Sequence, residues 1–123
     1  MTELVILMLE TEQPEGLSAR KLVVETAKHN VITAYCPSTG LDLLRRFPAV
    51  DAVLVHSALI DQRPTLLSEV RDIAPHARTI VACPTQHAIF EQADWVVDSH
   101  QPQQLLNLLV REFHVSARSD NND

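Results

Sequence analysis

Five side chains that could do chemistry each follow a short apolar run of the sequence. They are Glu10, Glu12, His56, Cys83 and Asp98. Carboxylates together with one imidazole are suitable ligands for several divalent metals. Cys83 could instead act as a nucleophile, with His56 or His87 as its base. The simpler interpretation is favoured for each: solvated loop acids, a strand-end histidine with a local hydrogen bond, and a buried cysteine.

Several motifs that would signal a specific chemistry are absent from the sequence. Two glycines in 123 residues leave no glycine-rich loop of the kind that cradles phosphates. Six histidines and two cysteines, Cys36 and Cys83, occur without the paired spacing of a structural zinc site. We therefore expect no resident cofactor, no metal and no enzymatic activity.

Charge and hydropathy limit which kinds of partner the protein can bind and in which cell compartment we expect it. The formal net charge of −6 argues against a general nucleic-acid binder, which would carry a basic patch. No apolar run approaches the ~18 residues that a membrane span needs. Residues 1–3 lack the cationic start of a signal peptide, and two cysteines make no disulfide framework. We expect a cytoplasmic globular protein that binds neither nucleic acid nor a membrane.

The apolar pattern alternates between two lengths. Short continuous runs rich in β-branched residues are typical of strands buried on both faces of a parallel sheet. They lie at 4–9, 31–35, 52–55, 79–82 and 95–97. Apolar residues at helical spacing alternate with them, at 19–27, 43–47, 67–74 and 105–113. This order predicts an α/β domain in which right-handed crossovers place helices on both faces of a parallel sheet.

Local signals set the boundaries of some elements. Thr39 and Asp42 have the spacing of a capping box and predict the start of the second helix. Only twelve residues, 83–94, separate the fourth strand from the fifth, so we expect a shortened or irregular fourth helix there. The single domain is expected to span residues 1–115, with a mobile polar tail at 116–123.

Two stretches of the sequence resemble the receiver domain of bacterial response regulators. Residues 34–54 read A-Y-C-P-S-T-G-L-D-L-L-R-R-F-P-A-V-D-A-V-L, and V-H-S-A-L-I-D follows them. They are similar to the short helix, third strand and loop of that family. Residues 93–95 and 102–105 are similar to its fifth strand and to the start of its last helix. The resemblance covers about residues 3–115. It implies a flavodoxin-like fold, an open five-stranded parallel sheet of order 2-1-3-4-5.

Most residues that carry phosphoryl transfer in receivers are replaced in this sequence. The resemblance puts the phosphoacceptor position, an Asp in the family, on His56. The acidic pair that holds Mg²⁺ falls on residues 10–12, the Ser/Thr on Cys83 or Thr85, and the Lys on Asp98. Asp98 puts a negative charge where the phosphoryl oxygens need a cation. The resemblance therefore implies an inactive phosphorylation pocket.

Together these features predict a stand-alone pseudo-receiver, a non-catalytic signalling module that binds a protein partner or forms a homodimer. The alternative is a small-ligand- or metal-binding α/β domain, or an enzyme, that uses the carboxyl edge of the sheet. Apolar surface left uncovered by the short fourth helix is expected to form the protein contact. The residues expected in this contact are Ile89, Phe90, Trp95 and Leu108.

Overall fold

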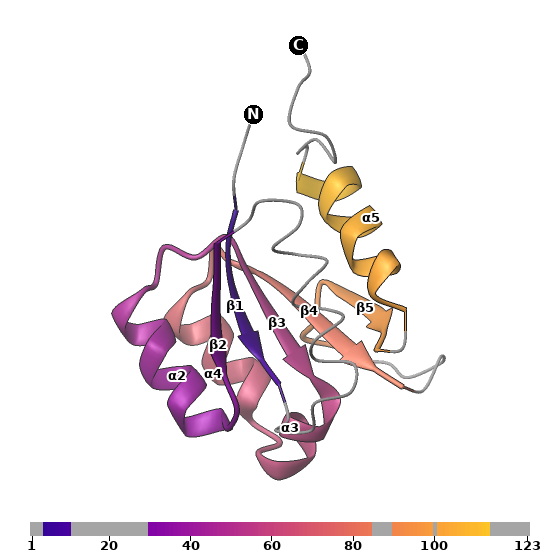
Figure 1. Cartoon of the computed structure of the whole chain (residues 1–123). Helices are drawn as coiled ribbons and strands as arrows, with labels where there is room; N and C mark the ends of the chain where they lie inside the picture. Colours follow the sequence, from indigo (N-terminus) through magenta and orange to yellow (C-terminus); the bar gives the residue numbers. More distant parts are fainter. Residues whose placement is uncertain (1–3, 11–29, 85–89, 100, 114–123) are drawn as a thin grey trace.

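A five-stranded parallel sheet organises the chain, for which a computed structural model describes residues 4–10, 30–84, 90–99 and 101–113 (Figure 1). The strands of this described part are β1 (Val5–Leu9), β2 (Asn30–Ala34), β3 (Ala52–His56), β4 (Arg78–Cys83) and β5 (Trp95–Asp98). Their order across the sheet is β2-β1-β3-β4-β5, and every neighbouring pair is parallel. The predicted fold class and strand order are confirmed.

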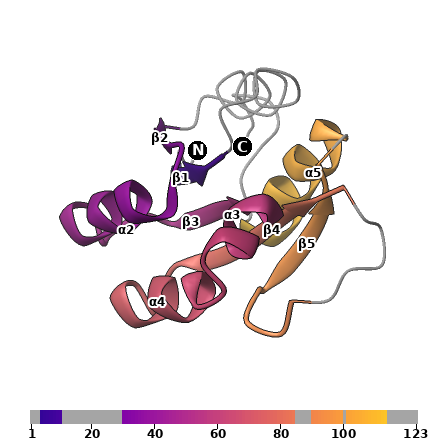
Figure 2. The ribbon, with the colours of Figure 1, turned by 90° about the horizontal axis from the view of Figure 1, so that it is seen from below.

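Helices cover both faces of the sheet (Figure 2). Those in the described part are α2 (Pro37–Arg46), α3 (Ser57–Gln62), α4 (Leu66–Ile73) and α5 (Pro102–Phe113). Side chains of α2 and α4 pack on one face, and side chains of α5 pack on the other. The helix predicted at 19–27 lies outside the described residues.

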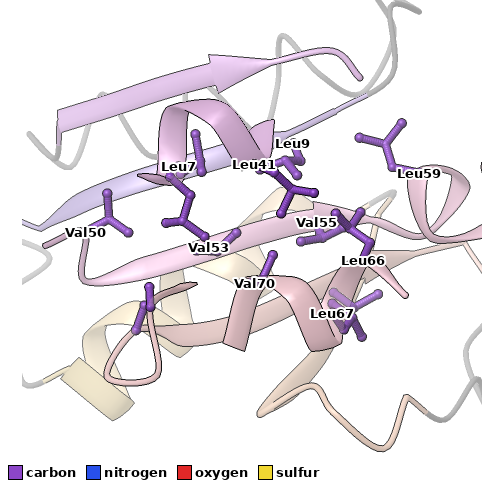
Figure 3. Packing of buried hydrophobic residues seen from close by; sticks show 14 of the residues in the cluster. Leu7, Leu9, Leu41, Val50, Val53, Val55, Leu59, Leu66, Leu67 and Val70 are labelled. Atoms are coloured by element: carbon purple, nitrogen blue, oxygen red, sulfur yellow. The ribbon is translucent and has the colours of Figure 1, made fainter. Parts of the chain in front are cut away.

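Successive residues of a central strand point into two different cores. In β3, Val53 and Val55 belong to the cluster under α2 and α4, which Figure 3 shows. Ala52 and Leu54 belong to the cluster under α5. All four side chains are fully buried, so β3 has no polar face. This two-sided burial explains why the strand reads as a continuous apolar run rather than an alternating one.

The second helix begins earlier than the predicted capping box. α2 starts at Pro37, and Cys36 is its N-cap residue. Proline suits this position because its missing N–H would have no partner inside a first helical turn. Thr39 lies within the helix, so the prediction that it caps the helix is wrong.

A short helix that the apolar pattern does not predict, α3, follows β3 directly. The Nδ1 atom of His56 accepts a hydrogen bond from the Ala58 N–H at 3.1 Å and caps the helix. Leu59 is fully buried in the cluster under α2 and α4, and it anchors α3 to the sheet. Because α3 has only six residues, it is too short to show a periodic stripe.

The connection from β4 to β5 contains no helix in the part that the structure describes. Instead, hydrogen bonds hold it against α4. Ser68 Oγ donates to Gln92 Oε1 at 2.9 Å, and Arg71 Nη1 donates to the Gln92 carbonyl at 3.2 Å. These polar contacts join the apolar packing of Phe90 and Ala93 on the same cluster, so both hold the segment against the domain.

Two aspartates tie the amino ends of neighbouring strands together. Asp51 precedes β3, and its Oδ2 accepts the Val5 N–H of β1 at 2.8 Å, while its own N–H donates to the Val5 carbonyl at 2.8 Å. Asp94 precedes β5 and repeats the arrangement with Thr79 of β4, again at 2.8 Å for both bonds. Each aspartate therefore makes a reciprocal pair of bonds that sets the register where its strand begins.

Candidate functional site

Four of the five predicted site residues lie at the carboxyl edge of the sheet. They are Glu10 after β1, His56 in β3, Cys83 in β4 and Asp98 in β5. The strand register places them in two rows, because His56 pairs with Ala82 whereas Cys83 pairs with Asp98 one residue further along. Leu9 pairs with Val55, so Glu10, the next residue, lies beside His56. The fold therefore brings the four residues to one edge of the sheet, with Glu10 and His56 on the side of α5 and Cys83 and Asp98 on the side of α2 and α4.

Glu10 is fully buried, although it carries an ionisable side chain. Its N–H donates to the Ala34 carbonyl at 2.9 Å, which extends the pairing of β1 with β2 beyond Leu9. Because alternate strand residues share a face, Glu10 follows Met8 and lies on the side of the sheet that α5 covers. The expectation of an ordinary solvated loop acid is therefore wrong for Glu10.

The half-buried imidazole of His56 serves as the cap of α3. Its Nδ1 atom accepts the Ala58 N–H, so this nitrogen carries no proton in the capped state. The simpler interpretation of His56 predicts a local hydrogen bond of this kind.

The Cys83 thiol is buried in the core rather than presented at a surface. The residue is 5% exposed and belongs to the apolar cluster under α2 and α4. Its carbonyl accepts the Ser99 N–H at 3.1 Å and continues the contact between β4 and β5. A nucleophile must be reached by its substrate, so these surroundings favour a packing role for Cys83.

Two glutamines hold Asp98 at the end of β5. The Asp98 N–H donates to Gln104 Oε1 of α5 at 3.0 Å, and Asp98 Oδ2 accepts from Gln101 Nε2 at 3.4 Å. Gln104 Nε2 in turn donates to Gln101 Oε1 at 3.3 Å. Only Gln101 contacts the carboxylate, and both amides are neutral, so neither contributes a positive charge.

Two other predicted residues, Glu12 and Ile89, lie outside the described residues. Among the residues that the structure describes, no group of three His, Cys, Asp or Glu side chains is placed to hold a metal ion. No helix in this part of the chain combines the length and the apolar character that a membrane span requires.

The residues predicted to form an apolar contact surface do not share one face. Trp95 packs against the cluster under α5, whereas Phe90 packs against the cluster under α2 and α4. Leu108 is 3% exposed, so its prediction as a surface residue is wrong. The apolar face of α5 is wider than the main stripe of leucines, and Leu108 belongs to it. The exposed apolar residue of β5 is Val96, 37% exposed, which the sequence prediction missed.

A groove of about 240 Å³ lies between β5 and α5. The residues that line it are Trp95, Val96, Val97, Gln104, Asn107, Leu108 and Arg111. Beside the groove, the Arg78 guanidinium lies 5.3 Å from the centroid of the Trp95 ring, in a cation–π contact. Because β5 is the last strand of the sheet, this groove adjoins an open strand edge.

A second thiol, which sequence reasoning did not single out as a site, is exposed. Cys36 is exposed at the N-cap of α2, and its Sγ lies 3.0 Å from Thr39 Oγ1 and 3.6 Å from Ser38 Oγ. Hydrogen bonds to Thr39, first its hydroxyl and then its backbone, lower the pKa of the Cys36 thiol, and Ser38 contributes further. A cysteine directly before Pro-Ser-Thr is a visible signal for such a position, since helix N-termini favour the thiolate.

Comparison with known proteins identifies the fold. No family model and no curated protein matches the sequence. A response regulator receiver domain protein from Clostridium thermocellum is similar in structure, with a TM-score of 0.67 and 20% identity over 92% of this chain and 99% of that chain. A de novo designed protein with a Rossmann 2x3 fold has a TM-score of 0.65 and 10% identity over 99% of both chains. The chain therefore has the fold of a receiver domain, and the similar score of a designed protein means that this likeness concerns the fold alone.

Proposed function

We propose that the chain is a stand-alone pseudo-receiver, a cytoplasmic signalling module that acts by protein contact and takes up no phosphoryl group. The observation that carries the proposal is the pair of residues that end β3 and β5, His56 and Asp98. Phosphoryl transfer to a receiver needs an acceptor carboxylate at the first position and a cation at the second. This chain has an imidazole and a carboxylate there instead.

The contacts of these two residues support the same conclusion. The Nδ1 lone pair of His56 is already used by the Ala58 N–H, so that nitrogen is not available as a nucleophile while α3 is capped. Asp98 would repel the phosphoryl oxygens, because it puts a negative charge where the reaction needs a cation. Positioning and charge supply nearly all of the catalysis in phosphoryl transfer, so this edge lacks what the reaction requires.

Treatment with a small acyl-phosphate donor and Mg²⁺ tests the proposal. Intact-mass spectrometry should show no added phosphoryl group on this chain, while a working receiver in the same reaction becomes labelled. Stoichiometric phosphate uptake by the wild-type chain would overturn the proposal.

Two variants test whether charge is the reason for inactivity. His56→Asp restores the acceptor carboxylate but leaves Asp98 opposite it, so it should remain unlabelled. His56→Asp combined with Asp98→Lys restores both positions and should recover a trace of labelling. Efficient labelling of the single variant would contradict the role given to Asp98.

We propose that the partner contact is made through the open edge of β5 and that the partner is a second copy of the chain. Val96 leaves an exposed apolar side chain on this edge, and Trp95 lies at the adjoining groove. Unprotected strand edges favour association, and symmetric dimers are the commonest assemblies. In the described residues of the β4–β5 connection, no helix covers the Val96 side of this strand.

Sedimentation equilibrium tests the dimer. Val96→Glu should shift the wild-type dimer towards monomer, whereas Tyr35→Glu, at an equally exposed residue after the opposite edge strand β2, should not. Thermal unfolding of both variants checks that neither loses its fold. A wild-type chain that is monomeric at high concentration would overturn the homodimer proposal, and an unchanged dimer in Val96→Glu would place its interface elsewhere.

A further inference from the structure

The bond between His56 and Ala58 depends on the protonation state of the imidazole. Nδ1 can accept the Ala58 N–H, at 3.1 Å, only while it carries no proton. A proton taken from solvent onto Nδ1 would set two N–H groups against each other and break this bond. We infer that protonation of His56 releases the first turn of α3, so that the carboxyl edge of the sheet responds to pH.

The charges around the ring act in opposite directions. The first N–H groups of α3 carry partial positive charge, which opposes a cation at His56. Glu10, placed next to His56 by the strand register, is a buried acid that favours a cation. Among the other titratable groups, Asp98 is on β5, two strands from His56, and Cys83 is on β4, between β3 and β5. Asp61 is exposed on α3 itself. The protonated ring therefore has a reason to leave the cap.

Loss of the cap would act on a small and clearly placed part of the molecule. α3 packs on β3 and β4, and Leu59 holds it in the core. Residues 57 and 58 precede this anchor, so they can open while Leu59 stays packed. The expected change is local fraying of one turn at the end of β3, not unfolding of the domain.

Histidine is the side chain whose ordinary charge change falls near neutral pH, so the test spans that range. The inference depends on the hydrogen bond at the start of α3 and not on the proposed function. Phosphate uptake by the chain would leave it intact, and failure of the pH response would leave the pseudo-receiver proposal intact.

Amide hydrogen exchange of Ala58, corrected for intrinsic exchange rates, tests the switch with two substitutions. Lowering the pH from about 7.5 to about 5.5 should raise the exchange of Ala58 about fivefold in the wild type, as expected for loss of a helix cap. His56→Asn keeps a capping oxygen that does not titrate, so its Ala58 exchange should stay slow at both pH values. His56→Ala has no cap and should exchange fast at both.

Controls separate this response from other titrating groups. His87→Asn, a change outside the described residues, should keep the wild-type pH response. If a substituted chain fails to fold, the ¹⁵N shift of Nδ1 in the wild type shows directly whether the proton arrives as Ala58 is released. Wild-type exchange that stays as slow as that of His56→Asn at both pH values would overturn the inference.

Discussion

Gly40 marks the closest approach between α2 and β1, and replacing it with alanine should destabilise the protein. A Cβ at this position would lie 2.6 Å from Leu9 Cδ2, 2.7 Å from Leu9 Cγ and 3.2 Å from Leu9 Cδ1. Carbon atoms prefer to be about 3.5–4.0 Å apart. Rotation about the outer bond of Leu9 cannot relieve the contact with Cγ, and Leu9 is fully buried. The added methyl group must therefore displace the strand or the helix.

Two opposing terms set the size of the effect. Overpacking a core costs about 1–3 kcal/mol. Alanine is favoured over glycine inside a helix by about 1 kcal/mol. The steric term exceeds the helical gain, so Gly40→Ala should lower the free energy of unfolding by up to about 2 kcal/mol. Urea denaturation followed by circular dichroism measures this, provided that the m-value stays constant.

A matched pair in the same helix calibrates the helical term. Asp42 is exposed in α2, so Asp42→Ala should be more stable than Asp42→Gly by about 1 kcal/mol. Combining Gly40→Ala with Leu9→Ala should cost less than the sum of the two single changes, because the truncated side chain makes room. If Gly40→Ala is instead stabilising by the margin measured at Asp42, the close approach to Leu9 does not constrain α2.

Three further predictions concern single side chains. Hydrogen bonds from Arg63 and from the Thr65 hydroxyl lower the pKa of Glu69 from 4.5 to about 2. The ion pair of Glu69 with Arg63 therefore stabilises the fold above pH 4.5, and this stabilisation is lost as the pH falls towards 2. The stability of Glu69→Gln, measured by urea denaturation, should therefore converge with that of the wild type across this range; a constant difference would contradict the assignment. Iodoacetamide should alkylate the exposed Cys36 well before the buried Cys83 in the folded protein, and equal rates in peptide mapping would refute the difference in exposure. Asp51→Ala should cost about 1 kcal/mol by removing the acceptor of the Val5 N–H, whereas Asp51→Asn, which keeps an oxygen there, should cost less. If the two variants lose equal stability in thermal unfolding, the effect comes from the charge of Asp51 and not from its hydrogen bond.

The central strands could be predicted because each is buried on two faces. Residues 52–55 and 79–82 are continuous β-branched and small apolar runs, and the structure places them at the centre of the sheet. The carboxyl edge followed from the same pattern, since residues after parallel strands meet at one end of a sheet. The fold class and the meeting of Glu10 with His56 therefore come from apolar periodicity and topology, whereas the strand order came from the resemblance to receiver domains.

Features set by single contacts could not be predicted in the same way. The helix α3 depends on one imidazole cap and one buried leucine, and neither leaves a periodic signal. The burial of Glu10 depends on how far β1 continues beside β2, which the sequence does not mark. Leu108 appeared to lie off the apolar stripe because the width of a helix contact is decided by the sheet that it covers.

The reciprocal aspartate pairs bear on how such a chain can evolve. Asp51 and Asp94 set strand register at the amino end of the sheet, at the opposite end from His56 and Asp98. Selection for a correctly paired sheet therefore acts on one end of the strands, and selection for chemistry acts on the other. Substitutions at the carboxyl edge can accumulate without shifting the register, so a lineage can exchange one chemistry there for another, or lose it, while its descendants keep the same fold.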